Sequence, residues 1–296
     1  MPRPDPAAWA ALHTAAPQAT VYTAGWWLDE VAAGRWGAVV VPDGAHGYAA
    51  ALPVPLRRRW RGLGPTDILQ PFFTQQLGVL SRAEAAPDAA PFLAALPPGL
   101  RAYGQLHCRN HVSAAPTGFR VGERVTYHLD LAAPYAALAA GFHQNHRRNL
   151  KKASELLIAE ENDAAPTVIE LFRATKGREL PDVKPRHYAL LGRLAAGLAA
   201  RHQLRVLLAR DAASGAVLAG GLFAADARHT IYLLGGGSEA GRQRGAMHAV
   251  VDGLLRREAG TANRLLDFEG SMVESVARFY AGFGARPVPY LTFQRP

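Results

Sequence analysis

The spacing of apolar residues in the second half of the chain changes from one segment to the next, and each segment predicts an element. Apolar runs at residues 204–210, 217–223 and 230–234 have the length and composition of buried strands. Tight turns at residues 213–215 and 226–228 separate them. These three strands should therefore form an antiparallel meander.

A helix, a strand, a second helix and a last strand should follow this meander. Their predicted ranges are residues 241–258, 264–268, 274–283 and 290–294. Because a helical crossover joins residues 230–234 to residues 264–268, these two strands should be parallel neighbours.

Two further helices should precede the meander. Over residues 142–157, apolar side chains recur at a helical spacing, with His146 on the same face. We interpret His146 as a core histidine rather than a ligand. Another helical pattern covers residues 187–201, after a proline-flanked turn.

The first half predicts a smaller α/β unit. Its expected helices are residues 26–33 and 88–96, and its expected strands are residues 36–41, 48–54 and 100–107. Residues 114–118 resemble a linker, and a strand at residues 125–131 should open the second half. We therefore predict domains at residues 1–120 and 121–296, both of mixed α/β class.

Composition narrows the functional classes. With 49% hydrophobic residues and 19% charged residues in 296, the chain should fold around a filled core. Cys108 is the only cysteine, which excludes an internal disulfide and a cysteine metal cluster. No apolar run is long enough to span a membrane, and the N-terminus lacks the apolar core of a signal peptide. We expect a cytoplasmic protein without a metal.

The net charge of +9 favours acidic partners such as nucleic acid, an anionic membrane or a phosphate-rich ligand, unless it only reflects an Arg-rich coding bias. The sequence contains no HExxH pair, Walker loop or Gly-x-Ser-x-Gly elbow. Metalloprotease chemistry, phosphoryl transfer and serine hydrolysis are therefore disfavoured.

Candidate acid–base residues gather near the C-terminus. Asp267 and Glu269 flank Phe268 at the end of a predicted strand, so both carboxylates should face one side. Such proximity raises the pKa of one carboxyl, and we favour Glu269, nearer the strand end, as the base. Alternatively, they cap the next helix or pair with an arginine. Tyr280 should point inward from that helix, either as a general acid or as an ordinary buried tyrosine.

Two other groups suggest ligand contacts. Glycines 235–237 and Ser238 follow the central strand, where they would let a ligand approach the backbone, although Ser238 could equally cap a helix. Basic side chains cluster on one side of the helix at residues 142–157, as an anion-binding ridge or simply as a solvated face: Arg147, Arg148, Lys151 and Lys152.

Four segments occur in an order that resembles the GNAT superfamily of N-acyltransferases, in particular its acetyltransferase-6 branch. They are Arg-Arg-Asn-Leu-Lys-Lys-Ala at 147–153, residues 233–238, Leu-Asp-Phe-Glu-Gly at 266–270, and Arg-Phe-Tyr-Ala-Gly-Phe-Gly-Ala at 278–285. The second half is also similar to the Fem transferases, which build peptidoglycan bridges and pair two such domains. Residues 70–78 resemble a segment of the first domain in this branch.

The resemblance implies tandem GNAT-like domains, with acyl-CoA (acetyl-CoA, for example) in a gap between two splayed strands. It implies transfer of the acyl group to the amine of a small molecule or peptide. Tyr280 would then protonate the CoA thiolate, and Glu269 or Asp267 would help to deprotonate the amine. Donor-binding residues would be Leu234, Gly235, Gly236, Gly237, Ser238, Arg242 and Gly245. Acceptor-binding residues would be Gln75, Gln76, Arg147, Arg148, Lys151 and Lys152.

Two departures keep other functions open. Met247 stands where the GNAT phosphate loop usually has Gly or Ala, which suggests a non-catalytic binding protein on a transferase scaffold as one alternative. Tyr280 stands where Fem enzymes typically carry a lysine. This second departure favours acyl-CoA as the donor over aminoacyl-tRNA, which a Fem-like transferase would use with tRNA as a partner.

Overall fold

The computed structural model describes residues 1–44, 47–59, 64–270 and 272–296. The chain divides into two compact units, residues 1–125 with 288–296, and residues 126–287. Strand β12 (Arg286–Arg295) pairs with β5 (Ala102–Gln105), so the chain end returns to the first unit. The predicted domain of residues 121–296 includes this last strand, because the partner of a strand cannot be read from its own residues.

The first unit is a mixed sheet with short helices. Its strands follow the order β1-β2-β3-β5-β12, and β4 pairs with β2. The remaining elements are α1 (Pro6–Ala15), η1 (Val21–Thr23), α2 (Gly25–Val31), β1 (Trp36–Asp43), β2 (Gly47–Arg58), β3 (Thr66–Leu69), β4 (Leu80–Ser81) and α3 (Ala90–Ala94).

Tryptophans supply much of the bulk beneath the first helices of this unit. Trp9 and Trp27 are buried, and the ring centroids of Trp9 and Trp36 lie 5.0 Å apart. All five tryptophans of the chain occur at or before position 60 in the sequence.

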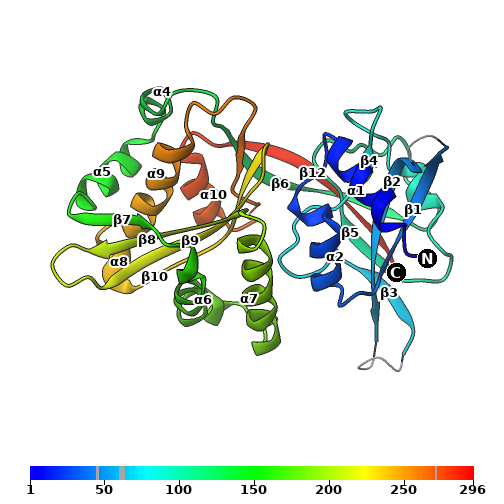
Figure 1. Cartoon of the computed structure of the whole chain (residues 1–296), viewed down its shortest axis with the longest axis horizontal. Coiled ribbons are helices and arrows are strands. Elements are labelled where there is room, and N and C mark those ends of the chain that lie inside the picture. The colour runs from blue at the N-terminus through cyan, green and yellow to red at the C-terminus, as the bar shows by residue number, and fades with distance from the viewer. Residues whose placement is uncertain (45–46, 60–63, 271) are drawn as a thin grey trace. The chain divides into compact units, whose positions relative to one another are not determined.

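The second unit is also a mixed sheet, in the order β6-β11-β10-β9-β8-β7. Helices α5, α9 and α10 lie on one face of it, and α6 and α7 on the other (Figure 1). Its elements are β6 (Arg120–Asp130), α4 (Tyr135–Ala140), α5 (Gln144–Lys152), β7 (Leu156–Glu160), η3 (Asn162–Ala164), α6 (Ala165–Ala174), η4 (Lys176–Glu179), α7 (Pro185–Ala199), β8 (Leu204–Asp211), β9 (Val217–Ala225), β10 (His229–Gly237), α8 (Glu239–Gln243), α9 (Ala246–Glu258), β11 (Leu265–Asp267) and α10 (Glu274–Ala281).

The predicted meander and crossover are confirmed. Strands β8, β9 and β10 pair antiparallel in sequence order, and β10 pairs parallel with β11. Apolar runs bounded by turn residues determine this part of the topology.

Two predicted helices are wrong in extent. The pattern over residues 142–157 joins two elements, since α5 ends at Lys152 and β7 begins at Leu156. Leu157 is 58% exposed on β7 instead of facing the core from a helix. The helix predicted over residues 241–258 is broken at Gly245, whose φ of 70° lies in the left-handed region.

A cluster of histidine and phenylalanine rings joins α5, α9 and α10. The centroids of His146 on α5 and His248 on α9 lie 4.6 Å apart, and both rings contact Phe279 and Phe283. His146 is only 4% exposed and its Nε2–H donates to the Phe279 carbonyl at 2.8 Å. The prediction of a core histidine at this position is confirmed.

This environment disfavours imidazolium ions. Burial, reinforced by the neighbouring His146, lowers the pKa of His248 to about 4. Burial also lowers the pKa of His146, although its hydrogen bond to Phe279 acts in the opposite direction. Both rings are therefore neutral near pH 7.

Among the described residues, no helix combines the length and apolarity needed to cross a membrane.

Candidate functional site

Strands β10 and β11 pair over only a short stretch. The aligned residues are His229 with Leu265, Thr230 with Leu266, and Ile231 with Asp267. Strand β11 ends there, whereas β10 continues to Gly237 and stays paired with β9 on its other side. From Tyr232 onward, the β10 edge toward β11 has no partner strand in the described part of the chain, so its backbone groups are available to a ligand.

A β-bulge re-aims the side chains at the start of this edge. The register between β10 and β9 shifts between Tyr232 and Leu234, so Leu233 is the extra residue. A Cβ at Gly235 would overlap the Tyr232 hydroxyl, and one at Gly236 would overlap the backbone of Phe172 on α6. Internal packing thus explains two of the three glycines that the sequence associated with a donor.

The residues after β10 form two helix starts. The Ser238 hydroxyl accepts from the Gly241 N–H at 3.1 Å and caps α8, and Arg242 pairs with Glu239 within that helix. Gly245 precedes α9, where an added Cβ would lie 2.5 Å from the Asn149 carbonyl oxygen. The first N–H groups of α9 have no carbonyl partner within the helix, which makes this end favourable for an anion.

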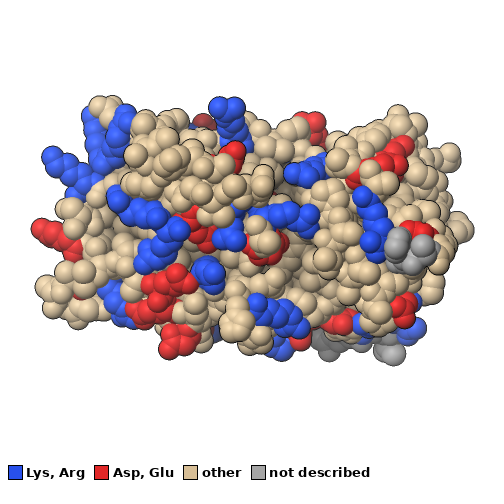
Figure 2. All heavy atoms as spheres, turned by 45° about the horizontal axis from the view of Figure 1, so that its top comes forward, with Lys and Arg blue, Asp and Glu red and all other residues tan. Residues whose placement is uncertain are grey.

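Four cations of α5 accompany that helix start. They are exposed and form no ion pair within the described residues: Arg147, Arg148, Lys151 and Lys152. Because Asn149 touches Gly245, the second half of α5 lies beside the start of α9. Figure 2 shows Lys and Arg side chains gathered toward the left of the face that carries α5. The two helices together form a positively charged region.

Tyr280 lies under the end of β11. Its ring stacks on Phe268 with centroids 4.8 Å apart, and the rings of Tyr127 and Tyr232 lie 6.0 Å and 6.2 Å away. The side chain is 8% exposed, and its hydroxyl makes no hydrogen bond within the described residues. This hydroxyl is therefore free to contact a ligand.

The electrostatic surroundings keep Tyr280 protonated. Burial raises its pKa well above the usual range, and the neighbouring Tyr232, Glu269 and Asp267 raise it further. A phenol in this state can give a proton to a strongly basic leaving group.

Asp267 is buried and fully engaged. Its carboxylate accepts from the Thr126 hydroxyl at 2.6 Å and from the Glu269 N–H at 2.9 Å, and its Oδ2 lies 3.4 Å from His128 Nε2. Burial on its own would raise the pKa of Asp267, but His128, Thr126 and Glu269 together hold it below its usual range. Asp267 is thus ionised near neutral pH.

Glu269 does not alternate with Asp267 along a strand, contrary to the geometry expected from the sequence. Strand β11 stops at Asp267, and Glu269 has a φ of 55°. Its N–H closes a turn onto Asp267, so the two carboxylates are separated by a bend rather than by a strand repeat.

The sequence reasoning missed Thr126 and His128 on β6. Both lie on the strand face that meets Asp267, since His128 and Asp267 are directly aligned between β6 and β11. The alternation of polar Thr126 and His128 with Tyr127 was a visible signal, but its meaning required knowing which strand lies beside β6.

Gln75 and Gln76 lie within the first unit. Gln76 is 3% exposed; its side chain accepts from the Cys108 N–H at 2.7 Å and donates to Gln75 at 3.0 Å. These contacts brace the loop after β5.

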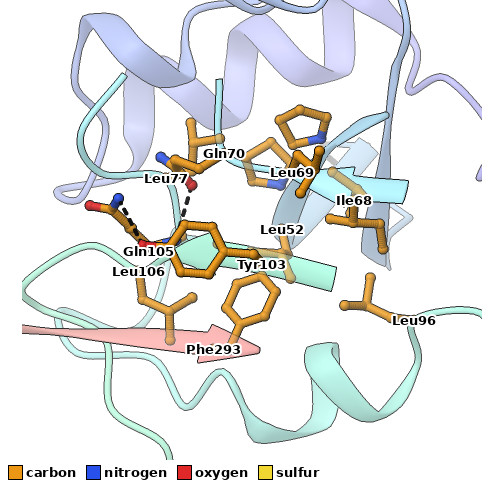
Figure 3. Close-up of a pocket in the computed structure, with 15 residues that line it drawn as sticks. Leu52, Ile68, Leu69, Gln70, Leu77, Leu96, Tyr103, Gln105, Leu106 and Phe293 are labelled. Carbon is orange, nitrogen blue, oxygen red and sulfur yellow. Dashed lines mark hydrogen bonds between the residues drawn. The ribbon is translucent and has the colours of Figure 1, made fainter. Parts of the chain in front are cut away.

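The first unit repeats the parallel pair in β3 and β5, aligned at Ile68 with Ala102 and Leu69 with Tyr103. Here the Gln70 side chain accepts from the Gln105 N–H at 3.0 Å, and the Leu77 N–H donates to the Gln105 carbonyl at 2.9 Å. The chain itself therefore occupies the backbone groups of β5. The adjoining apolar cavity (Figure 3) has a volume of about 10 Å³, room for roughly one water molecule.

Within the described residues, no group of three or more His, Cys, Asp or Glu side chains is arranged to hold a metal ion.

Residues 140–271, which include α5, the β10–β11 pair and both carboxylates, match the family model described as an acetyltransferase (GNAT) domain. This segment, which is less than half of the chain, is therefore similar to the GNAT family. The family supports acyl transfer as the general class of activity. No curated protein matches the chain.

Solved structures show how far the fold extends beyond that segment. FemX has 12% sequence identity and a TM-score of 0.65, with 97% of this chain and 95% of FemX covered. L-PGS from Bacillus licheniformis has 14% identity and a TM-score of 0.50, with 99% and 92% covered. A conserved protein of unknown function from Bacteroides thetaiotaomicron has 10% identity and a TM-score of 0.57, with 90% of each chain covered. The predicted mixed α/β, tandem GNAT-like fold is confirmed.

Proposed function

We propose that the protein is an N-acyltransferase that moves an acyl group from acyl-CoA to the amine of a small molecule or peptide. The observation that carries this proposal is the unpaired β10 edge beside the free hydroxyl of Tyr280. A thioester donor needs an extended edge for its amide-containing arm and an acid for its departing sulfur, and these two features supply both.

In this proposal the donor follows β10 toward α9. The arm of the cofactor pairs with the backbone along Leu234, Gly235, Gly236, Gly237 and Ser238. The phosphates meet the start of α9 at Gly245, with Arg242 and the cations of α5 nearby. The positive charge of α5 and the helix dipole of α9 act in the same direction.

The reaction proceeds by direct attack. The amine nitrogen forms a bond to the thioester carbonyl carbon and the carbon–sulfur bond breaks. Tyr280 gives its hydroxyl proton to the thiolate, and Glu269 helps the amine to lose its proton. Asp267, which is held by Thr126 and His128, fixes the turn that carries Glu269.

A second candidate function is transfer from aminoacyl-tRNA. The observation that favours it is the set of α5 cations without ion-pair partners, because a polyanionic donor would neutralise them. The low-identity likeness to FemX and L-PGS does not distinguish the two donors.

Donor binding separates these functions. We expect acetyl-CoA or a longer CoA thioester at about 100 times its Kd to stabilise the protein by about 2.7 kcal/mol, visible as a raised melting temperature. Stabilisation by charged tRNA alone, lost at high salt, would instead indicate the second function. A protein that none of these ligands stabilises would be a non-catalytic member of the fold, and our proposal would be wrong.

Tyr280→Phe tests the chemistry. With acetyl-CoA bound, the variant should release CoA at least about 100-fold more slowly, because the thiolate loses its acid. Tyr188→Phe on α7 is the matched control, since it removes a hydroxyl from the other face of the sheet. Equal rates for wild type and Tyr280→Phe would refute the assignment.

A cytoplasmic location, expected from the single cysteine, remains part of this proposal.

A further inference from the structure

A polar cluster occupies the face of the β6–β11 pair opposite to Tyr280. His128 and Asp267 are aligned across the two strands, so their side chains point to one face, and Thr126 shares it. Tyr127 precedes His128 and Phe268 follows Asp267 in the chain, and both rings contact Tyr280 on the other face. The end of β11 thus has a phenol on one face and an imidazole–carboxylate pair on the other.

The imidazole of His128 has an unexplained buried atom. Its Nε2 is enclosed, 3.4 Å from Asp267 Oδ2, and forms no hydrogen bond within the described residues. A buried polar atom without a partner costs about 1–3 kcal/mol, so such an arrangement needs a reason. Acid–base pairs in unliganded sites are often too long for a good hydrogen bond and tighten when substrate is bound.

Asp267 suits the role of orienting this ring. Thr126 and the Glu269 N–H hold its Oδ1, which leaves Oδ2 directed at His128. With Nε2–H toward the carboxylate, the other ring nitrogen, Nδ1, carries the lone pair that can accept a proton. This is the relation between orienting carboxylate and histidine base that acyl-transfer sites use.

We propose that His128 is the catalytic base of the acyl transfer, with Asp267 as its positioning residue. The inference rests on the proposed function. As the amine nitrogen bonds to the thioester carbon, its proton passes to His128 Nδ1; as the carbon–sulfur bond breaks, the sulfur takes the proton of Tyr280. The imidazolium and the phenolate then exchange a proton through solvent, which restores the enzyme.

Two physical arguments favour His128 for this step. An imidazole is a stronger base than a carboxylate and is better matched to neutral pH, so His128 replaces Glu269 as the group that takes the proton of the amine, and Glu269 attracts the ammonium form of the acceptor. The incoming nitrogen and the departing sulfur are also bonded to the same carbon. An acid and a base on opposite faces of the strand end can therefore act separately, with Tyr280 on the sulfur and His128 on the nitrogen.

The experiment uses the whole chain with acetyl-CoA and two acceptors that need no identification of the natural one. With water as the acceptor, the rate should depend strongly on the base, because hydrolysis of the thioester requires a proton to be removed from water. With hydroxylamine as the acceptor, the rate should depend less on the base, because its attacking nitrogen loses a proton readily to solvent. CoA release and the melting temperature with acetyl-CoA are measured in parallel.

His128→Gln should slow hydrolysis by about 100-fold or more and should slow reaction with hydroxylamine much less, while acetyl-CoA still raises its melting temperature. Added imidazole should restore part of the hydrolysis by His128→Ala. His202→Asn, at an exposed position outside the site, should match wild type.

Asp267→Asn should lower the rate without weakening acetyl-CoA binding, and combining it with His128→Gln should cause little further loss, because the two residues act as one unit. A purely structural Asp267 would instead give additive losses. If Asp267→Asn does not fold, His128→Gln alone decides.

Hydrolysis by His128→Gln at the wild-type rate would overturn this inference and leave the proposed function intact. A wild-type protein that acetyl-CoA neither stabilises nor acylates would overturn the proposed function, and the role of His128 with it.

Discussion

Acidification should weaken the second unit through the buried pair His146 and His248. The pKa of each histidine is lower in the folded chain than in the unfolded one. At pH values between the folded and the unfolded pKa, the unfolded state therefore binds more protons. Stability is therefore full above the unfolded pKa and is lost as the pH falls toward the folded pKa. For His248 this window runs from 6.5 down to about 4.

The magnitude follows from the linkage relation. For a group with these two pKa values, lowering the pH from about 7.5 to about 5 costs at most about 2 kcal/mol. The His248 ring is only partly buried, and solvent screening reduces the expected loss to about 1–2 kcal/mol. His146 adds a loss of the same sign.

Urea unfolding followed by far-UV circular dichroism measures this effect at both pH values. His248→Phe keeps an aromatic ring among Phe279 and Phe283 but cannot be protonated, so its stability should depend less on pH by about 1–2 kcal/mol. The comparison is between pH values within each variant, which cancels any packing cost of the substitution.

His202→Asn is the control, because position 202 is exposed and asparagine tolerates its positive φ of 56°. It should retain the wild-type dependence on pH. Equal pH dependence in His248→Phe and wild type would refute the argument that burial of this ring opposes its protonation.

Three further predictions concern the proposed donor site. Tyr280→Phe should lower the rate of CoA release at least about 100-fold without changing donor affinity, as steady-state kinetics would reveal. Gly245→Ala should cost roughly 1–2 kcal/mol of stability, because alanine disfavours the left-handed backbone conformation. It should also weaken acetyl-CoA binding by displacing Asn149. A thermal-shift titration with acetyl-CoA measures both effects, and an unchanged melting temperature and affinity would contradict them. Arg148→Gln with Lys152→Gln should weaken acetyl-CoA binding and flatten its salt dependence, and an unchanged salt slope would exclude these cations from the site.

The topology around the site was predictable because local sequence patterns determine it. The apolar runs of β8, β9 and β10 and the turns between them determined the meander and the parallel neighbour of β10. Helix ends were less predictable, since the apolar spacing of α5 continues by chance into β7, as Leu157 shows.

The site itself was predictable only in part. Tyr280 and the two carboxylates are consecutive features of one segment, whereas His128 meets Asp267 only because β6 lies beside β11. The turn at Glu269 depends on a side-chain acceptor, Asp267, and on a left-handed residue, which an alternating strand pattern conceals.

The placement of the indole rings has a practical consequence for anyone who studies this chain in solution. Because every tryptophan belongs to the first unit, emission excited selectively from indole monitors the melting of that unit and is blind to the one that contains Tyr280. A single indole added on α7 would give each half its own optical reporter, and any difference between the two melting curves would measure how independently the halves unfold.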